Sequence, residues 1–274
     1  MEAIRIDIEE YVHSGEGANG ESLNHRTNPA LMVKLYNASA DIGVIENELK
    51  YAALMHEAGI PTPKPGDFVT DGNGRYGIRF ERIVGKKSFS RACGDNPENV
   101  EQYARRFAAM CRILHSTKLD KSKFINVKDQ YRDFLAHLDC YAPEEREFIE
   151  RTIENAPDGD TAIHGDLQFS NAIMVGDKDY FIDLGDAAYG SPLFDLGMVL
   201  FTCKYDNVDF LREVFHMEPS TAAEFWHWFV KGYFGEDADP DKKDRELRPY
   251  AALKLLLMER LCGCLPEYHY LLKD

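Results

Sequence analysis

Polar side chains gather at the turns of one stretch of the chain, which begins at His164 and reads HGDLQFSNAIMVGDKDYFIDLGDAAYGSPLFDLG. Two short apolar runs, residues 171–175 and 180–184, flank a turn-forming Gly-Asp-Lys-Asp segment. This pattern predicts a β-hairpin. The hairpin would place Asn171 at the start of one strand and Asp183 at the end of the other.

Oxygen ligands would meet near Asp166 in that arrangement, because the side chains of Asn171 and Asp183 would face a common point beside it. Carboxylate and amide oxygens, together with substrate phosphates, are the ligands that Mg²⁺ prefers. The stretch therefore predicts a Mg²⁺ site.

The spacing of these residues carries more information than their composition. Asp166 and Asn171 match the pattern H-x-D-x-x-x-x-N, in which the Asp accepts a hydroxyl proton and the Asn holds metal. This is the catalytic-loop pattern of kinases, and Asp183-Leu-Gly then takes the place of their metal-binding D-F-G motif. The Gly after His164 and the run IDLGDAAYGSPLFDLG resemble the aminoglycoside phosphotransferase-like family of small-molecule kinases, in the protein-kinase-like superfamily. The resemblance covers nearly the whole chain and is strongest over residues 164–197. The alternative is a loop and hairpin with ordinary surface carboxylates.

Bulk composition bounds the class of protein. The 274 residues are 44% hydrophobic and 29% charged, which is typical of a globular chain with a substantial core. The net charge of −15 speaks against a nucleic-acid partner, which needs a basic face. It is compatible with a cationic substrate, and equally with solubility alone. No apolar run is long enough to span a membrane, and the start does not resemble a signal peptide, so we expect no membrane partner and a cytoplasmic location.

The six cysteines show no framework spacing, which favours reduced thiols. Cys262 and Cys264 lie in a helical pattern, where their side chains would point to different faces. We therefore expect no metal site there.

The N-terminal part predicts a small sheet with one helix. Residues 3–12 alternate apolar and polar and predict a half-buried strand. The Gly-rich residues 13–22 form a turn that could approach phosphate oxygens. Lys34 lies inside a second apolar strand, 31–36, where it needs a partner or a function. Residues 41–58 predict a helix that ends at a Gly and a Pro.

The family resemblance assigns roles to this part. Lys34 would contact the α- and β-phosphates of a nucleotide, braced by Glu48 in preference to Glu46. The Gly-rich loop would cover the phosphates through Gly17, Gly20 and Ser22. At a hinge, the Glu81 carbonyl and the Ile83 amide would bond the nucleotide base.

The character of the chain changes after a hairpin formed by strands 67–70 and 74–83. We expect an α+β, two-lobed protein-kinase-like fold. Residues 1–83 would form a small antiparallel β-sheet lobe with one helix, and residues 84–88 would form a linker. Residues 89–274 would form a mainly helical lobe with the catalytic hairpin and the acceptor site. A helix is predicted to start at Asn96-Pro97-Glu98, with the Pro at its first helical position. Further helices are predicted over 127–140, 143–155, 192–203, 207–215, 219–234 and 241–272.

Three further polar residues are expected to support the catalytic loop: His164, Asp186 and Asp195, the last in the first turn of a helix. A loop at 235–241 carries four acids, which form either a solvated linker or a rim that attracts cations. The aromatic residues at 225–229 are expected in the core and cleft wall.

These patterns predict a phosphotransferase. It would move the γ-phosphate of ATP or GTP, with Mg²⁺, to a hydroxyl of a small molecule, with Asp166 orienting the hydroxyl and taking up its proton. The acidic balance mildly favours an amine-bearing acceptor such as an aminoglycoside. One alternative is a metal-dependent hydrolase with four ligands: His164, Asp166, Asp183 and Asp186. The other is a non-catalytic nucleotide-binding protein.

Overall fold

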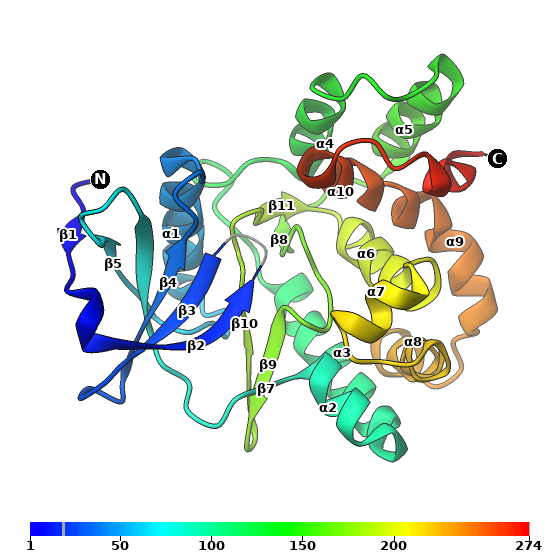
Figure 1. Ribbon diagram of the computed structural model, residues 1–274. Helices are drawn as coiled ribbons and strands as arrows, with labels where there is room; N and C mark the ends of the chain where they lie inside the picture. The colour runs from blue at the N-terminus through cyan, green and yellow to red at the C-terminus, as the bar shows by residue number, and fades with distance from the viewer. Residues whose placement is uncertain (18–19, 274) are drawn as a thin grey trace. The chain divides into compact units, whose positions relative to one another are not determined.

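The computed structural model describes residues 1–17 and 20–273, and the chain has the mixed α+β class predicted from its sequence. It divides into two compact units (Figure 1). The first contains residues 1–87 together with 173–186, and the second contains residues 88–172 and 187–273. Within these described ranges, no helix has both the length and the hydrophobicity needed to cross a membrane.

A six-stranded sheet and one helix make up most of the first unit. The sheet order is β1-β5-β6-β4-β3-β2, with β1 parallel to β5 and the other neighbours antiparallel. The elements are β1 (Ile4–Arg5), the 3₁₀ turn η1 (Ile8–Glu10), β2 (Tyr11–Gly17), β3 (Gly20–His25), β4 (Leu31–Tyr36), α1 (Ile42–Glu57), β5 (Pro65–Thr70) and β6 (Tyr76–Glu81).

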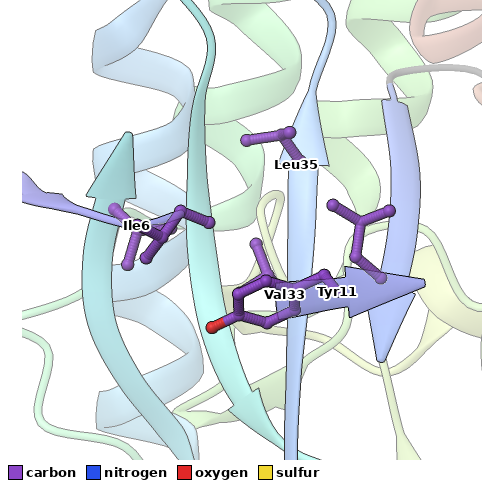
Figure 2. Close-up of a cluster of buried hydrophobic side chains, with 6 residues drawn as sticks. Ile6, Tyr11, Val33 and Leu35 are labelled. Atoms are coloured by element: carbon purple, nitrogen blue, oxygen red, sulfur yellow. The ribbon is translucent and has the colours of Figure 1, made fainter. Parts of the chain in front are cut away.

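Apolar side chains cover both faces of this sheet. Figure 2 shows Val33 and Leu35 of β4 packed with Ile6 and Tyr11 from the N-terminal segment. On the opposite face, Tyr36 packs with residues of α1 and of the neighbouring strands: Ile45, Leu49, Phe68 and Ile78. Successive side chains of a strand point to opposite faces, so β4 has a core on each side. Burying each large aliphatic side chain contributes about 1.5–3 kcal/mol.

The continuous strand predicted over residues 3–12 is wrong. The Asp7 carboxylate accepts a backbone hydrogen bond of 3.0 Å and begins η1 between two strands. Because of this turn, Ile6 is buried while Ile4 and Ile8 are 49% and 39% exposed. An aspartate that caps a turn thus overrides the alternating pattern.

The helix α1 agrees with the expected 41–58. Asp41 caps its first turn by accepting the backbone N–H groups of Gly43 and Val44, and Gly59, at φ +83°, follows its end. In the segment that follows α1, the backbone carbonyl of Pro61 accepts the backbone N–H of Phe181 at 2.8 Å.

The predicted hairpin is present as β9 (Ala172–Val175) and β10 (Lys178–Phe181). With β7 (Lys87–Ser88) they form a sheet of order β10-β9-β7. The sequence placed the whole hairpin after the linker, among the helices, whereas residues 173–186 belong to the first compact unit. The linear boundaries at 83 and 88 stay a prediction.

The second unit is mainly helical. Its elements are α2 (Phe89–Asp95), η2 (Pro97–Asn99), α3 (Val100–Ser116), α4 (Val127–Ala136), α5 (Pro143–Asn155), β8 (Thr161–Ile163), β11 (Ala188–Gly190), α6 (Leu193–Lys204), α7 (Val208–Glu213), α8 (Pro219–Phe234), α9 (Pro240–Ala252), α10 (Lys254–Cys262) and η3 (Pro266–Leu272). Strands β8 and β11 pair antiparallel. Phe107 of α3 packs against Phe225 and Phe229 of α8, so these two aromatics of α8 form core.

Two helix predictions need correction. The helix expected over 127–140 ends at Ala136. The single helix expected over 241–272 is three elements, α9, α10 and η3. Pro249 offers no backbone N–H to the last turn of α9, and Gly263, at φ +82°, ends α10. Apolar periodicity continues across both breaks, which is why it did not reveal them.

Candidate functional site

In the first unit, the structure brings together three of the predicted site residues. Lys34 Nζ lies 2.7 Å from Glu48 Oε1 and 2.5 Å from Asp183 Oδ1. Glu48 also accepts the hydroxyl hydrogen of Tyr36. Glu46, the weaker candidate, instead pairs with the N-terminal amine. Strand β4, helix α1 and the residues after β10 each supply one member of the triad Lys34–Glu48–Asp183.

Opposing effects set the charge states of this triad. Burial would lower the pKa of Lys34, but the carboxylates of Asp183 and Glu48 outweigh it and raise that pKa well above its ordinary value. Burial raises the pKa of Glu48, and the charge of Lys34 offsets part of that rise. Burial also raises the pKa of the Tyr36 hydroxyl, which therefore stays protonated as a donor. Lys34 is thus a fixed cation between two carboxylates.

The backbone at Asp183 is in the left-handed region, with φ +59°. Asp adopts this conformation more readily than most residues, and such residues cluster at functional sites. The Asp183 side chain is 44% exposed. Close by, burial lowers the pKa of Lys86, and the charge of Asp183 offsets part of that decrease. Burial raises the pKa of Tyr51, a residue of α1, and the negative charge of Asp186 raises it further. The predicted support residue Asp186 therefore lies near α1.

The predicted phosphate-covering residues lie along β2 and β3. Gly17 ends β2 and Gly20 begins β3, while Ala18 and Asn19 between them lie outside the described residues. A Cβ on Gly20 would lie 2.2 Å from the carbonyl oxygen of Leu35, so only glycine fits against β4 there.

Ser22 lies directly opposite Lys34 in the β3–β4 register, so their side chains share a face of the sheet. The predicted hinge positions lie at the C-terminal end of β6 and just after it. Glu81 ends β6, and Ile83 comes two residues later.

In the second unit, Asp166 is held by three side chains. Its Oδ1 accepts from Lys254 Nζ at 2.7 Å, and its Oδ2 accepts from Asn171 Nδ2 at 3.0 Å and from Gln168 Nε2 at 3.4 Å. Asn171 Nδ2 also donates to the Asp166 carbonyl at 3.0 Å. Because the amide nitrogen points to Asp166, a metal at Asn171 would bind Oδ1, which also accepts the Ser170 hydroxyl at 3.4 Å.

The charge on Asp166 is stabilised by Lys254. Burial would raise the pKa of Asp166, but the Lys254 ammonium, His164 and the hydrogen bond from Asn171 bring it below its ordinary value. Asp166 therefore stays a carboxylate and a hydrogen-bond acceptor at neutral pH.

The start of the Asp166 loop is fixed by a buried carboxylate. Asp195 accepts the backbone N–H groups of His164 at 2.7 Å and Gly165 at 3.0 Å. Its Oδ2 also lies 3.1 Å from His115 Nε2, and His115 Nδ1 lies 2.8 Å from the hydroxyl of Tyr233. This network orients the loop in the way expected for a supporting residue.

The hydrolase alternative needs His164 as a metal ligand. His164 is fully buried, and its Nδ1 accepts the backbone N–H of Asp166 at 3.3 Å. Its ring therefore orients the loop, and the geometry does not favour that alternative.

Lys254 was missed by the sequence reasoning. It begins α10 in the sequence KLLLMERLC, where the apolar run reads as core, and its side chain is 8% exposed. A buried lysine among leucines requires a counter-charge, and that requirement was the available signal. Two acids of the 235–241 loop have structural partners: Glu236 pairs with Arg105, and Asp239 caps α9. Two of the four acids in this loop therefore have structural roles.

This chain is similar to known proteins both in sequence and in structure. The sequence model described as "Phosphotransferase enzyme family" matches residues 19–226. A curated relative, a probable bifunctional tRNA threonylcarbamoyladenosine biosynthesis protein of Methanosphaera stadtmanae, is 33% identical over 75 residues. That match spans 27% of this chain and 13% of the relative.

Solved structures match over nearly the full length. A thermostable mutant of aminoglycoside phosphotransferase APH(4)-Ia, in ternary complex with AMP-PNP and hygromycin B, has a TM-score of 0.65 and 13% identity, covering 97% of this chain and 93% of the other. A choline/ethanolamine kinase family protein from Mesorhizobium loti has a TM-score of 0.57 and 17% identity, covering 95% and 84%. At these identities the likeness shows the fold.

Proposed function

We propose that this chain, which belongs to the phosphotransferase enzyme family, transfers the γ-phosphate of ATP or GTP to a hydroxyl group of a small molecule. Its fold is the two-lobed, kinase-like fold of aminoglycoside phosphotransferases, and the family makes it a small-molecule phosphotransferase. The finer assignment of nucleotide, metal and acceptor rests on the side chains of the candidate site.

The observation that carries the proposal is the Lys34–Glu48–Asp183 triad. A lysine that contacts nucleotide phosphates must be charged and aimed, and Glu48 fixes it at 2.7 Å. The same ammonium lies 2.5 Å from Asp183, the residue at the first position of the predicted metal-binding motif. We infer that Lys34 holds the α- and β-phosphates while Glu48 keeps its side chain extended from β4.

Asp183 and Asn171 are each a donor of the type that Mg²⁺ binds. Asp183 offers a half-exposed carboxylate, and Asn171 offers its amide oxygen, since its nitrogen is engaged by Asp166. These are hard oxygen ligands of the kind Mg²⁺ takes with substrate phosphates. When bound, the ion would neutralise phosphate charge.

Asp166 acts on the acceptor hydroxyl. Its carboxylate accepts that hydroxyl's hydrogen bond and takes up the proton as the acceptor oxygen bonds to the γ-phosphorus and the bond from that phosphorus to the bridging oxygen breaks, releasing ADP or GDP. Because Lys254 keeps the pKa of Asp166 low, the carboxylate is a weak base. It therefore orients the nucleophile first and accepts the proton late, which suits a loose phosphoryl-transfer transition state.

An amine-bearing acceptor is the favoured substrate class. The net charge of −15 concentrates cations at acidic surfaces. Two of the similar structures are an aminoglycoside phosphotransferase in complex with hygromycin B and a choline/ethanolamine kinase family protein.

Calorimetric titration of Mg·ATP and Mg·GTP into the full chain tests the nucleotide site. Wild type should bind one of them, only with the metal. Lys34→Ala should weaken binding by at least about tenfold, because hydrogen bonds to charged groups contribute about 1.5–3 kcal/mol. Asp183→Asn should weaken the binding of the Mg·nucleotide, because it removes a charged metal ligand. Asp166→Ala should keep the affinity and lose turnover.

Exposed residues of the same elements provide matched controls. Lys50→Ala on α1 and Asp177→Asn in the hairpin turn should leave the affinity unchanged. A wild-type protein that binds neither nucleotide at millimolar concentration would show that the proposal is wrong.

A further inference from the structure

A group of metal-ligating side chains lies in the second unit, apart from the residues assigned to phosphoryl transfer. Cys140, Glu259, Cys264 and His269 each offer one ligand atom, and these atoms all lie within 4.8 Å of one another. We propose that this cluster binds a structural Zn²⁺ ion. The inference stands independently of the proposed function, because it concerns other side chains.

The four ligands come from separate parts of the chain. Cys140 lies between α4 and α5, and Glu259 lies in the last turns of α10. Gly263 ends that helix with φ +82°, so Cys264 leaves the helical path, and His269 follows in η3. The expectation that Cys264 continues a helix is therefore wrong, and with it the argument against a metal there.

The distances already approach those of a tetrahedral site. His269 Nε2 lies 2.9 Å from Glu259 Oε1, and Cys140 Sγ lies 3.3 Å from Glu259 Oε2. Ligands 2.0–2.3 Å from zinc are separated from one another by about 3.3–3.8 Å. The ion would fit if the widest separations, which are at most 4.8 Å, shortened and the 2.9 Å His269–Glu259 pair opened to about 3.3 Å.

The imidazole is oriented as a zinc ligand. His269 Nδ1 lies 3.1 Å from Glu145 Oε2, while Nε2 faces Glu259. A metal-bound histidine commonly donates its second ring N–H to a carboxylate in this way. Glu145 is itself fixed, because it accepts the backbone N–H of Ala142 at 2.9 Å. Tyr141 stacks on the ring, 5.2 Å between centroids.

The chemistry of the donors selects the metal. Glu259 has a fully buried side chain, and a cation would offset the cost of burying its charge. Two sulfur ligands exclude Mg²⁺ and Ca²⁺, which take oxygen, whereas Zn²⁺ accepts thiolate, imidazole and carboxylate together. Four protein ligands leave no open position, which is the mark of a structural site.

The site would tie the α4–α5 connection and η3 to α10. This helix begins with Lys254, which contacts Asp166 at 2.7 Å, and it ends beside the cluster. Zinc would therefore stabilise the helix that presents Lys254.

Zinc content and affinity test the site directly. The full chain, purified without a histidine tag and kept reduced, should contain about one zinc per molecule by mass spectrometry of the element. Cys264→Ser should reduce the affinity, measured by competition with a chromogenic chelator, by at least about a hundredfold. The matched control Cys262→Ser, an exposed cysteine two residues away, should bind as wild type. Glu145→Gln should weaken binding by about 10–100-fold while keeping every ligand.

Thermal unfolding separates loss of metal from loss of fold. Chelated wild type and Cys264→Ser should melt at the same temperature, and added zinc should raise the melting temperature of wild type alone. Co²⁺ should give thiolate charge-transfer absorption in wild type. Three results would overturn the site: no zinc in wild type, equal losses in Cys262→Ser and Cys264→Ser, or a Cys140–Cys264 disulfide in the native protein.

Discussion

At the scale of single residues, Lys254 is the side chain with the most direct influence on Asp166. Its ammonium and the Asn171 amide lower the pKa of a carboxylate that burial alone would raise. Replacing Lys254 with Met removes that charge, so the pKa of Asp166 rises. The acid limb of kcat/KM should then move to higher pH, since the protonated carboxyl cannot accept the hydroxyl proton. We expect kcat/KM at neutral pH to fall by about 10–100-fold.

Two variants separate this effect from a loss of stability. Lys254→Arg keeps the charge, so it should retain the wild-type acid limb even where its turnover is lower. Lys242→Met removes an exposed lysine of α9 and should leave the whole pH profile unchanged. A Lys254→Met enzyme whose acid limb stays in place would refute the electrostatic role.

At the scale of elements, the approach of β3 to β4 depends on Gly20. A Cβ at this position would lie 2.2 Å from the Leu35 carbonyl, so Gly20→Ala must displace β3. We expect a loss of about 1–3 kcal/mol in the free energy of unfolding, measured by urea denaturation. Nucleotide affinity should fall as well, because Ser22 of β3 lies opposite Lys34.

Gly15 of β2 provides the matched control for this change. A Cβ there would meet nothing within 4 Å, so Gly15→Ala should alter stability by at most about 0.5 kcal/mol. Equal effects of the two substitutions would show that β3 and β4 do not approach as closely as described.

Elements marked by local signals could be predicted from the sequence, whereas contacts between distant residues could not. Local signals gave the hairpin and α1, because turn residues and caps lie next to the elements they bound. Lys254 and Asp166 are 88 positions apart, and no local pattern reports such a pair. The cluster around Glu259 escaped for the same reason, since Cys140 is 119 positions away. The break after α10 also hid it, because apolar periodicity does not mark where a helix ends.

At the scale of the whole molecule, the first unit is discontinuous in sequence. The chain leaves it after residue 87, builds helices of the second unit, and returns for residues 173–186. Lys34 lies in the first of these segments and Asp183 in the second. A nucleotide and metal that contact both should therefore stabilise two distant stretches of sequence as one.

Hydrogen exchange of the full chain should reveal this coupling. At a ligand concentration about 100 times Kd, binding stabilises the bound state by about 2.7 kcal/mol, which slows exchange by about a hundredfold where opening disrupts the site. Adding Mg²⁺ with AMP-PNP should protect peptides of β4, α1 and β10 together, while peptides of α8 keep their rates. At the same ligand concentration, Lys34→Ala should reduce the protection in all three by about tenfold or more, and the α1 control Lys50→Ala should retain it. Protection of β10 that appears without protection of β4 and α1 would show that residues 173–186 do not function with the first unit.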